Sequence, residues 1–209
     1  MKKIGWQKAL LAAVNAAQSA GRRLRRGLLS HKATREISRH DIKLDLDFEC
    51  QALIARLLRR AMPEVFVLGE EGATGDRRGP LRWVVDPIDG TVNFYYGIPH
   101  AAVSIALEMA QTPAAQPASR RNNPASCKNR HEGFEPVVGV IFDPFLDELW
   151  TAFKGGPARL NGRVVQVSPR ATLAEAMVSM GFGKEPALLK TALPLFDQLV
   201  RKTRKVRLM

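Results

Sequence analysis

Residues 83–94 read Trp-Val-Val-Asp-Pro-Ile-Asp-Gly-Thr-Val-Asn-Phe, which is an apolar stretch followed by a turn that carries two acids. The apolar start predicts a strand, and this strand delivers Asp86 and Asp89 into the turn. Pro87 fixes its own φ and Gly90 permits a tight bend, so the two carboxylates are held rigidly. Paired carboxylates at the end of a strand suit a hard divalent cation, which prefers oxygen ligands.

A second acidic turn lies a short distance upstream. Val65-Phe66-Val67 predicts another apolar strand, and Leu68-Gly69-Glu70-Glu71-Gly72 follows it. Two acidic strand ends so close in sequence can meet in space. We therefore expect Glu70 to join Asp86 and Asp89 in one site.

The two segments together resemble the inositol monophosphatase family of magnesium-dependent, lithium-sensitive sugar phosphatases. The resemblance is carried by Gly-Glu-Glu at residues 69–71 and by Asp-Pro-Ile-Asp-Gly-Thr-Val-Asn-Phe at residues 86–94. Either acidic turn alone is common and is explained by a solvated turn, whereas the full string at this spacing is specific. The resemblance runs from the first expected helix to the last residue.

This resemblance implies a set of site residues and a cofactor, Mg²⁺. The expected metal ligands are oxygen donors, namely Glu70, Asp86, Asp89 and the backbone carbonyl of Ile88. Glu70 and Thr91 are expected to orient and deprotonate the attacking water. Asp89 and the backbone amides around Gly90 and Thr91 are expected to contact the substrate, with the amides holding its phosphate.

The chemistry that a phosphate monoester needs agrees with these residue types. Its charge repels nucleophiles and its alkoxide is a poor leaving group, and bound divalent metal ions address both problems. We expect a metal-dependent phosphomonoester hydrolase that resembles inositol-1-monophosphatase. Its expected ligand is a small molecule, either an inositol phosphate or a related sugar phosphate.

The family's second motif, a Trp-Asp pair that completes the metal site, has no counterpart in the sequence. The tryptophans are Trp6, Trp83 and Trp150, and none of them precedes an aspartate. The sequence ends at Met209, where this part of the family begins, so we expect a chain that is truncated at its C-terminus. The alternative function is therefore a non-catalytic fragment or pseudoenzyme that only binds a metal or a partner.

The order of the predicted elements indicates an α+β fold. Helices come first, strands with hairpin turns follow, and a strand–helix unit comes last. The resemblance implies the layered α/β sandwich of the sugar phosphatases, with an incomplete C-terminal domain. We expect an N-terminal domain at residues 1–175, which carries the motifs, and the start of a second α/β domain at residues 176–209.

Three further features predicted from the sequence concern the site and its surroundings. Apolar residues at helical spacing predict a helix from residue 6 that frays from Gly21 onward. Asp45 or Asp47 can cap the next helix, and the resemblance also places an acid at the Asp47 position near the site. Residues 110–135 are rich in Pro, Ala, Asn and Arg, and they predict an inserted hairpin loop.

The remaining candidate metal ligands are weak. Cys127 and His131 lie together in the inserted loop but supply only two ligands, while His31 and His40 have no second ligand cluster near them in sequence. The chain has two cysteines, which make no disulfide framework. No apolar run is long enough to cross a bilayer, so we expect a cytoplasmic protein with no membrane partner. A homodimer is the assembly we consider.

The formal net charge of +12 raises a further question about partners. Basic residues gather at residues 22–26 and again at residues 201–207. A polyanion-binding surface is one interpretation, and the solvated faces of helices are the other. Because no aromatic residues interleave with these clusters and no nucleic-acid motif is present, the sequence favours solvated faces and no nucleic-acid partner.

Overall fold

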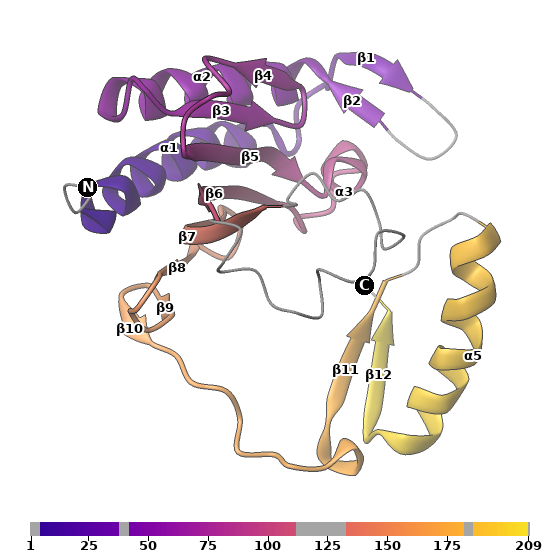
Figure 1. The fold of residues 1–209 in the computed structure, drawn as a ribbon. Coiled ribbons are helices and arrows are strands. Elements are labelled where there is room, and N and C mark those ends of the chain that lie inside the picture. The colour runs from indigo at the N-terminus through magenta and orange to yellow at the C-terminus, as the bar shows by residue number, and fades with distance from the viewer. Residues whose placement is uncertain (1–4, 38–41, 112–132, 182–185, 209) are drawn as a thin grey trace. The chain divides into compact units, whose positions relative to one another are not determined.

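The structure is a computed structural model that describes residues 5–37, 42–111, 133–181 and 186–208 (Figure 1). It divides into two compact units, Met1–Val165 and Gln166–Met209. The predicted domain boundary after residue 175 lies inside the second unit, and the domain assignment itself stays a prediction. His40, Cys127 and His131 lie outside the described residues.

The first unit contains helices, a large sheet and a small hairpin. Its described helices are α1 (Trp6–Gly27), α2 (Asp45–Ala61) and α3 (Thr91–Tyr95). The large sheet is built from β3 (Phe66–Gly69), β4 (Gly72–Thr74), β5 (Leu81–Asp89), β6 (Ala102–Ala110), β7 (Phe134–Asp143), β8 (Glu148–Phe153), β9 (Arg159–Leu160) and β10 (Arg163–Val164). The small hairpin is formed by β1 (Thr34–Ile37) and β2 (Ile42–Leu44).

The large sheet has the strand order β10-β9-β8-β7-β6-β5-β3-β4. Its strand pairs are antiparallel except for β3 and β5, which run parallel with Gly69 opposite Val85. The inserted loop joins the antiparallel strands β6 and β7, whose pairing extends to Ala110 and Phe134. The sheet therefore places the end of β3 directly beside the start of the acidic segment in β5.

Helices α1 and α2 cover one face of this sheet, with α1 against β7 and α2 against β5 (Figure 1). Alternate residues of β5 point into the interface, and the side chains of Trp83 and Val85 are almost fully buried there. Helix α1 meets the sheet with small side chains, including the fully buried Ala13 and Ala17. Small residues at helical spacing let the helix backbone approach the strands closely, and this interface forms the core.

The sequence prediction for the end of the first helix was wrong. Helix α1 continues without a break through Gly21 to Gly27. Gly21 is buried, and a β-carbon at this position would lie 2.5 Å from the ring of Phe142 in β7. Gly21 therefore serves close helix–sheet packing rather than helix termination.

The second unit is a separate strand–helix–strand arrangement. The short 3₁₀ helix η2 (Leu173–Glu175) precedes β11 (Met177–Met180), α5 (Pro186–Lys202) and β12 (Lys205–Leu208). β11 and β12 pair in parallel with Met177 opposite Lys205. β11 and α5 agree with the predicted strand–helix unit, and β12 follows them. Within the described residues, every helix of either unit is too short or too polar to span a lipid bilayer.

The packing of Gly21 gives a stability prediction. In an exposed helix interior, Gly→Ala stabilises by about 1 kcal/mol, whereas an added methyl in a packed core costs about 1–3 kcal/mol. We expect Gly21→Ala to lower the free energy of unfolding, measured by denaturant titration, because the buried Phe142 ring cannot move aside freely.

Gly139→Ala in β7 is the matched control, because a β-carbon at Gly139 would meet no atom within 4 Å. We expect this variant to change stability by less than the Gly21 variant. A Gly21→Ala protein that unfolds at higher denaturant concentration than the parent would contradict the close packing of α1 on β7.

Candidate metal centre

The ends of β3 and β5 bring two acidic residues together. Glu70 directly follows β3, and its backbone N–H donates to the carbonyl oxygen of Val85 at 3.1 Å. Asp86 is the residue after Val85, so the parallel register brings the two carboxyl groups into hydrogen-bond contact. The sequence prediction that the two acidic turns meet in space is confirmed for this pair.

The surroundings of Asp86 raise its pKa from an ordinary 3.8 to about 7. Burial is the largest cause, and the negative charges of Glu70 and Asp89 add to it. The hydrogen bond with Glu70 raises the pKa further, while the N–H of Ile88, 3.2 Å from the Asp86 carboxylate, lowers it. A carboxylate that is desolvated and crowded by like charges is one that a bound cation would stabilise.

An irregularity in β5 sets the direction of Asp89. In the pairing with β6, Asp86 lies opposite Ser104 and Asp89 lies opposite Ala102, so β5 holds one extra residue between them. Ile88 within this bulge is buried, whereas Asp89 is exposed. The bulge thus turns Asp89 away from the core, as bulges near functional sites commonly do.

The turn after Asp89 has the shape that its sequence predicts. Gly90 has a φ of 97°, and a β-carbon there would lie 2.7 Å from the carbonyl oxygen of His100. The Asn93 side-chain amide donates to the same carbonyl at 3.0 Å, and Phe94 is fully buried. The predicted tight bend at Gly90 is therefore confirmed, and Asn93 and Phe94 hold the turn in place.

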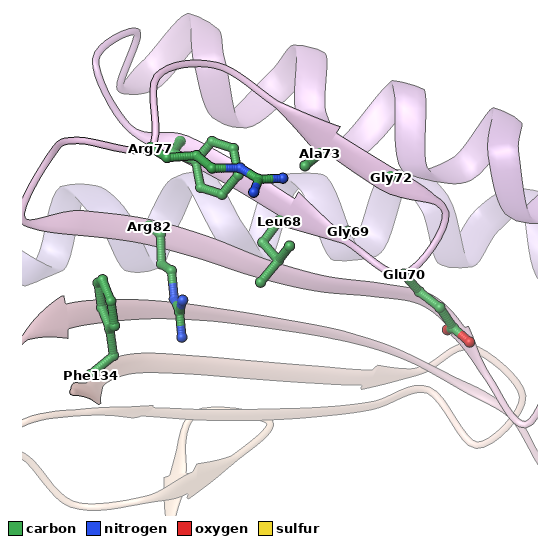
Figure 2. Close-up of a pocket in the computed structure, with 9 residues that line it drawn as sticks. Leu68, Gly69, Glu70, Gly72, Ala73, Arg77, Arg82 and Phe134 are labelled. Atoms are coloured by element: carbon green, nitrogen blue, oxygen red, sulfur yellow. The ribbon is translucent and has the colours of Figure 1, made fainter. Parts of the chain in front are cut away.

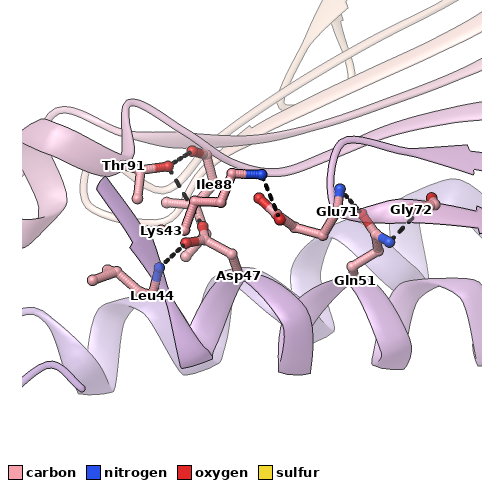
Figure 3. Close-up of polar contacts among 8 residues, drawn as sticks. All are labelled: Lys43, Leu44, Asp47, Gln51, Glu71, Gly72, Ile88 and Thr91. Atoms are coloured by element: carbon pink, nitrogen blue, oxygen red, sulfur yellow. Dashed lines mark hydrogen bonds and ion pairs between the residues drawn. The ribbon is translucent and has the colours of Figure 1, made fainter. Parts of the chain in front are cut away.

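Thr91 begins α3, and its hydroxyl has two acceptors within reach (Figure 3). It donates to the carbonyl oxygen of Ile88 at 2.8 Å, and one Asp47 carboxylate oxygen lies 3.5 Å away. A hydroxyl carries a single hydrogen, so these two acceptors compete for it. The predicted water-orienting residue and the predicted backbone metal ligand are thus in direct contact.

The sequence leaves two roles open for Asp47, a helix cap and an acid near the site. In the structure its carboxylate lies close to the Thr91 hydroxyl. It lies in the first turn of α2, where it accepts the N–H of Leu44 at 2.7 Å, and it is only 2% exposed. Burial, opposed by the Leu44 hydrogen bond and reinforced by Glu71 and Glu70, raises its pKa to about 6. Leu44 is the N-cap residue and Asp47 lies three positions beyond it, so Asp47 is not the predicted N-cap. It accepts the Leu44 backbone N–H from the first turn of the helix and also faces the site.

Glu70 also lines one end of a pocket of about 550 Å³ on the sheet (Figure 2). The side chains of Arg77 and Arg82 lie toward its other end. The Arg82 guanidinium donates to Glu108 at 2.8 Å, whereas Arg77 has no ion-pair partner in the described part of the chain. The pocket leaves room beside the acids for a ligand that carries negative charge.

The donor set fits magnesium in part. The described residues contain no group of three or more His, Cys, Asp or Glu side chains arranged to hold a metal ion. They do contain the Glu70–Asp86 pair, with Asp89 close enough to raise the pKa of Asp86. Mg²⁺ is typically held by one or two carboxylates, keeps several waters and binds substrate phosphate as well. The metal ligands therefore stay a prediction that this chemistry supports.

The raised pKa of Asp86 predicts how metal binding depends on pH. Below pH 7 the neutral form of Asp86 predominates, so a metal ion must displace a proton in order to bind. We expect Mg²⁺ or Mn²⁺ affinity, measured by calorimetry, to rise by up to about tenfold per pH unit as pH increases towards 7. The rise should level off above this pH.

Calorimetry in two buffers of different ionisation enthalpy counts the protons that are released. Asp86→Asn is the control, because it removes the group whose proton is displaced. An affinity that stays constant between pH 5.5 and 8 would show that no carboxyl of raised pKa takes part in binding.

Comparison with known proteins places these features in context. The sequence model described as the inositol monophosphatase family matches residues 6–120. The chain is 35% identical over 198 residues to the Nus factor SuhB of Xylella fastidiosa, which covers 93% of the chain. It is 30% identical over 203 residues to inositol monophosphatase 2 of Solanum lycopersicum, which covers 94% of the chain.

A solved structure shares the fold. The extragenic suppressor protein suhB from Bartonella henselae superposes with a TM-score of 0.77 at 30% identity, over 94% of this chain and 68% of that protein. The layered fold expected from the sequence is confirmed. The chain spans only 63% of the Xylella fastidiosa relative and 68% of the Solanum lycopersicum relative.

Proposed function

Because the chain belongs to the inositol monophosphatase family, we propose that its carboxylate site takes part in hydrolysing a phosphate monoester with Mg²⁺ as the cofactor. The observation that carries the proposal is the contact between Glu70 and Asp86, two acids that stand at adjacent strand ends. When bound, the metal would neutralise phosphate charge, lower the pKa of water and stabilise the leaving oxygen. Glu70, Asp86, Asp89 and the Ile88 carbonyl are the groups that would hold it.

We propose a small sugar phosphate, such as an inositol phosphate, as the substrate class. The name of the Solanum lycopersicum relative supports this choice. The pocket beside Glu70, with Arg77 at its far end, is compatible with a ligand that is both compact and anionic.

The residues around Thr91 provide a route for the proton of the attacking water. The Thr91 hydroxyl can accept a hydrogen bond from water while it donates its own hydrogen to Asp47 or to the Ile88 carbonyl. Asp47 is buried, and its pKa of about 6 is close to that of a useful general base. We assign Asp47 to hold Thr91 in orientation and to take up the proton, while Glu70 orients the water from the other side.

This proposal predicts the effect of removing one carboxylate charge. We expect Asp89→Asn to abolish Mg²⁺-dependent release of phosphate from inositol 1-phosphate, with a loss of at least about a hundredfold, because a metal ligand is lost. The measurement is phosphate release with and without Mg²⁺.

Asp76→Asn is the matched control, since Asp76 is an exposed acid paired with Arg78 outside the site. Equal rates of phosphate release for the Asp89 variant and the parent would contradict the assignment of Asp89 as a metal ligand. A parent chain that binds Mg²⁺ but releases no phosphate would instead favour the alternative of a non-catalytic metal-binding module.

A second candidate function rests on the charge of the helix layer. Helix α1 contains five basic residues and no acidic ones. Arg22, Arg25 and Arg26 are exposed at its C-terminal end, and the latter two have no ion-pair partner among the residues that the structure describes. The Xylella fastidiosa relative is named a Nus factor, which is a reason to test binding as well as catalysis. We infer that this end of α1 can bind a polyanion.

Salt dependence tests this second function. If Arg25 and Arg26 contact phosphates, their joint replacement by alanine should weaken binding of a short single-stranded RNA. It should also reduce the slope of log K against log salt by about 0.7 for each lost contact. Fluorescence anisotropy gives both quantities.

Arg78→Ala provides the comparison, because Arg78 is also exposed but belongs to the segment between β4 and β5 and not to α1. Retention of the parent slope by the double variant, or the absence of any RNA binding at low salt, would remove the second function and leave solvated helix faces as the explanation.

A further inference from the structure

Gln51 lies one turn beyond Asp47 on α2, and its side chain reaches the acidic turn that carries Glu70 (Figure 3). The carboxamide oxygen accepts the backbone N–H of Glu71 at 2.8 Å. The carboxamide nitrogen donates to the backbone carbonyl of Gly72 at 3.3 Å. One side chain thus satisfies a donor and an acceptor of successive residues, much as a neighbouring strand would.

The sequence of the turn is adapted to this contact. A β-carbon at Gly69 would overlap the Gln51 carboxamide and would lie 2.7 Å from its nitrogen. Gly69 therefore leaves the space that the amide group occupies. The backbone φ of Gly69 is not positive, so the close approach of Gln51 is what calls for glycine there.

A second contact holds the same turn from the side of β2. The Glu71 carboxylate is only 4% exposed, and Lys43 Nζ lies 2.9 Å from it. On the β5 side, the N–H of Glu70 donates to the Val85 carbonyl. Glu70 therefore stands between two anchored neighbours, with its backbone fixed on both sides.

We propose that Gln51 is a positioning residue, which fixes the acidic turn so that the Glu70 carboxylate faces Asp86. Gln51 acts through the backbone of Glu71 and Gly72 and does not itself contact the metal. The inference rests on the proposed function, since it assigns a supporting group to the proposed metal site. Groups that orient metal ligands commonly contribute about 10–100-fold to metal affinity.

Mn²⁺ titration followed by electron paramagnetic resonance tests this inference without requiring catalysis. Gln51→Met keeps the length of the side chain and removes both hydrogen bonds. We expect it to weaken Mn²⁺ binding by about 10–100-fold while the circular dichroism spectrum and the denaturation midpoint stay close to those of the parent. Gln51→Glu keeps an acceptor for the Glu71 N–H, and we expect it to retain most of the affinity.

Gln7→Met, on the exposed side of α1, is the matched control and should bind Mn²⁺ like the parent. If Gln51→Met fails to fold, Gly69→Ala provides the second variant, because its methyl group displaces the carboxamide and should cause the same loss of affinity.

The outcomes distinguish the positioning role of Gln51 from the proposed metal site on which this role rests. Parent-like Mn²⁺ affinity in Gln51→Met, or in Gly69→Ala where that variant replaces it, would overturn the positioning role and leave the proposed metal site standing. A parent protein that binds no Mn²⁺ would overturn the metal site, and the positioning role with it.

Discussion

Strands β3 and β5 run side by side in the same direction, in a sheet whose other pairs are antiparallel, so Glu70, which follows β3, lies beside Asp86 near the end of β5. This parallel register puts Glu70 against Asp86, where burial and then like-charge repulsion raise the pKa of Asp86. Parallel neighbours cannot be joined by a tight hairpin. Here the chain leaves β3 through β4 and returns on the other side of β3 before β5 begins. The acidic turn that follows β3 is a consequence of this route.

Helix α2 packs against β5 and contributes side chains to the region where Glu70 and Asp86 meet. The first turns of α2 supply Asp47, which contacts Thr91, and Gln51, which bonds to the turn around Glu70. Both residues project from the side of the helix that is packed against the core through Cys50 and Ile54. Because α2 is fixed by this apolar packing, the two polar side chains are held in place without needing mobile loops. A rigid element is what a metal or phosphate site requires of its surroundings.

The sequence predicted the local shape of the site better than its surroundings. The strand from Trp83 and the bend at Gly90 are local features, and each is visible in residues that are neighbours in the chain. Gly21 was misjudged because a glycine in a helical pattern commonly marks a helix end, and only the Phe142 ring reveals its packing role. Gln51 carries no such local signal, because its partners lie some twenty residues away in sequence.

The bulge in β5 determines which way an acid faces. Up to Val85, odd-numbered residues of this strand point into the core and even-numbered ones point outward. An unbroken ladder would send Asp89 inward, to the same face of the strand as Trp83, where an unpaired carboxylate would be strongly unfavourable. The one extra residue between Asp86 and Asp89 reverses the alternation and brings both acids outward. The direction of the two acids therefore depends on the number of residues between them as much as on their residue type. Asp86 and Asp89 are three residues apart, an odd spacing that would place them on opposite faces of a regular strand, and the bulge is what puts both on one face.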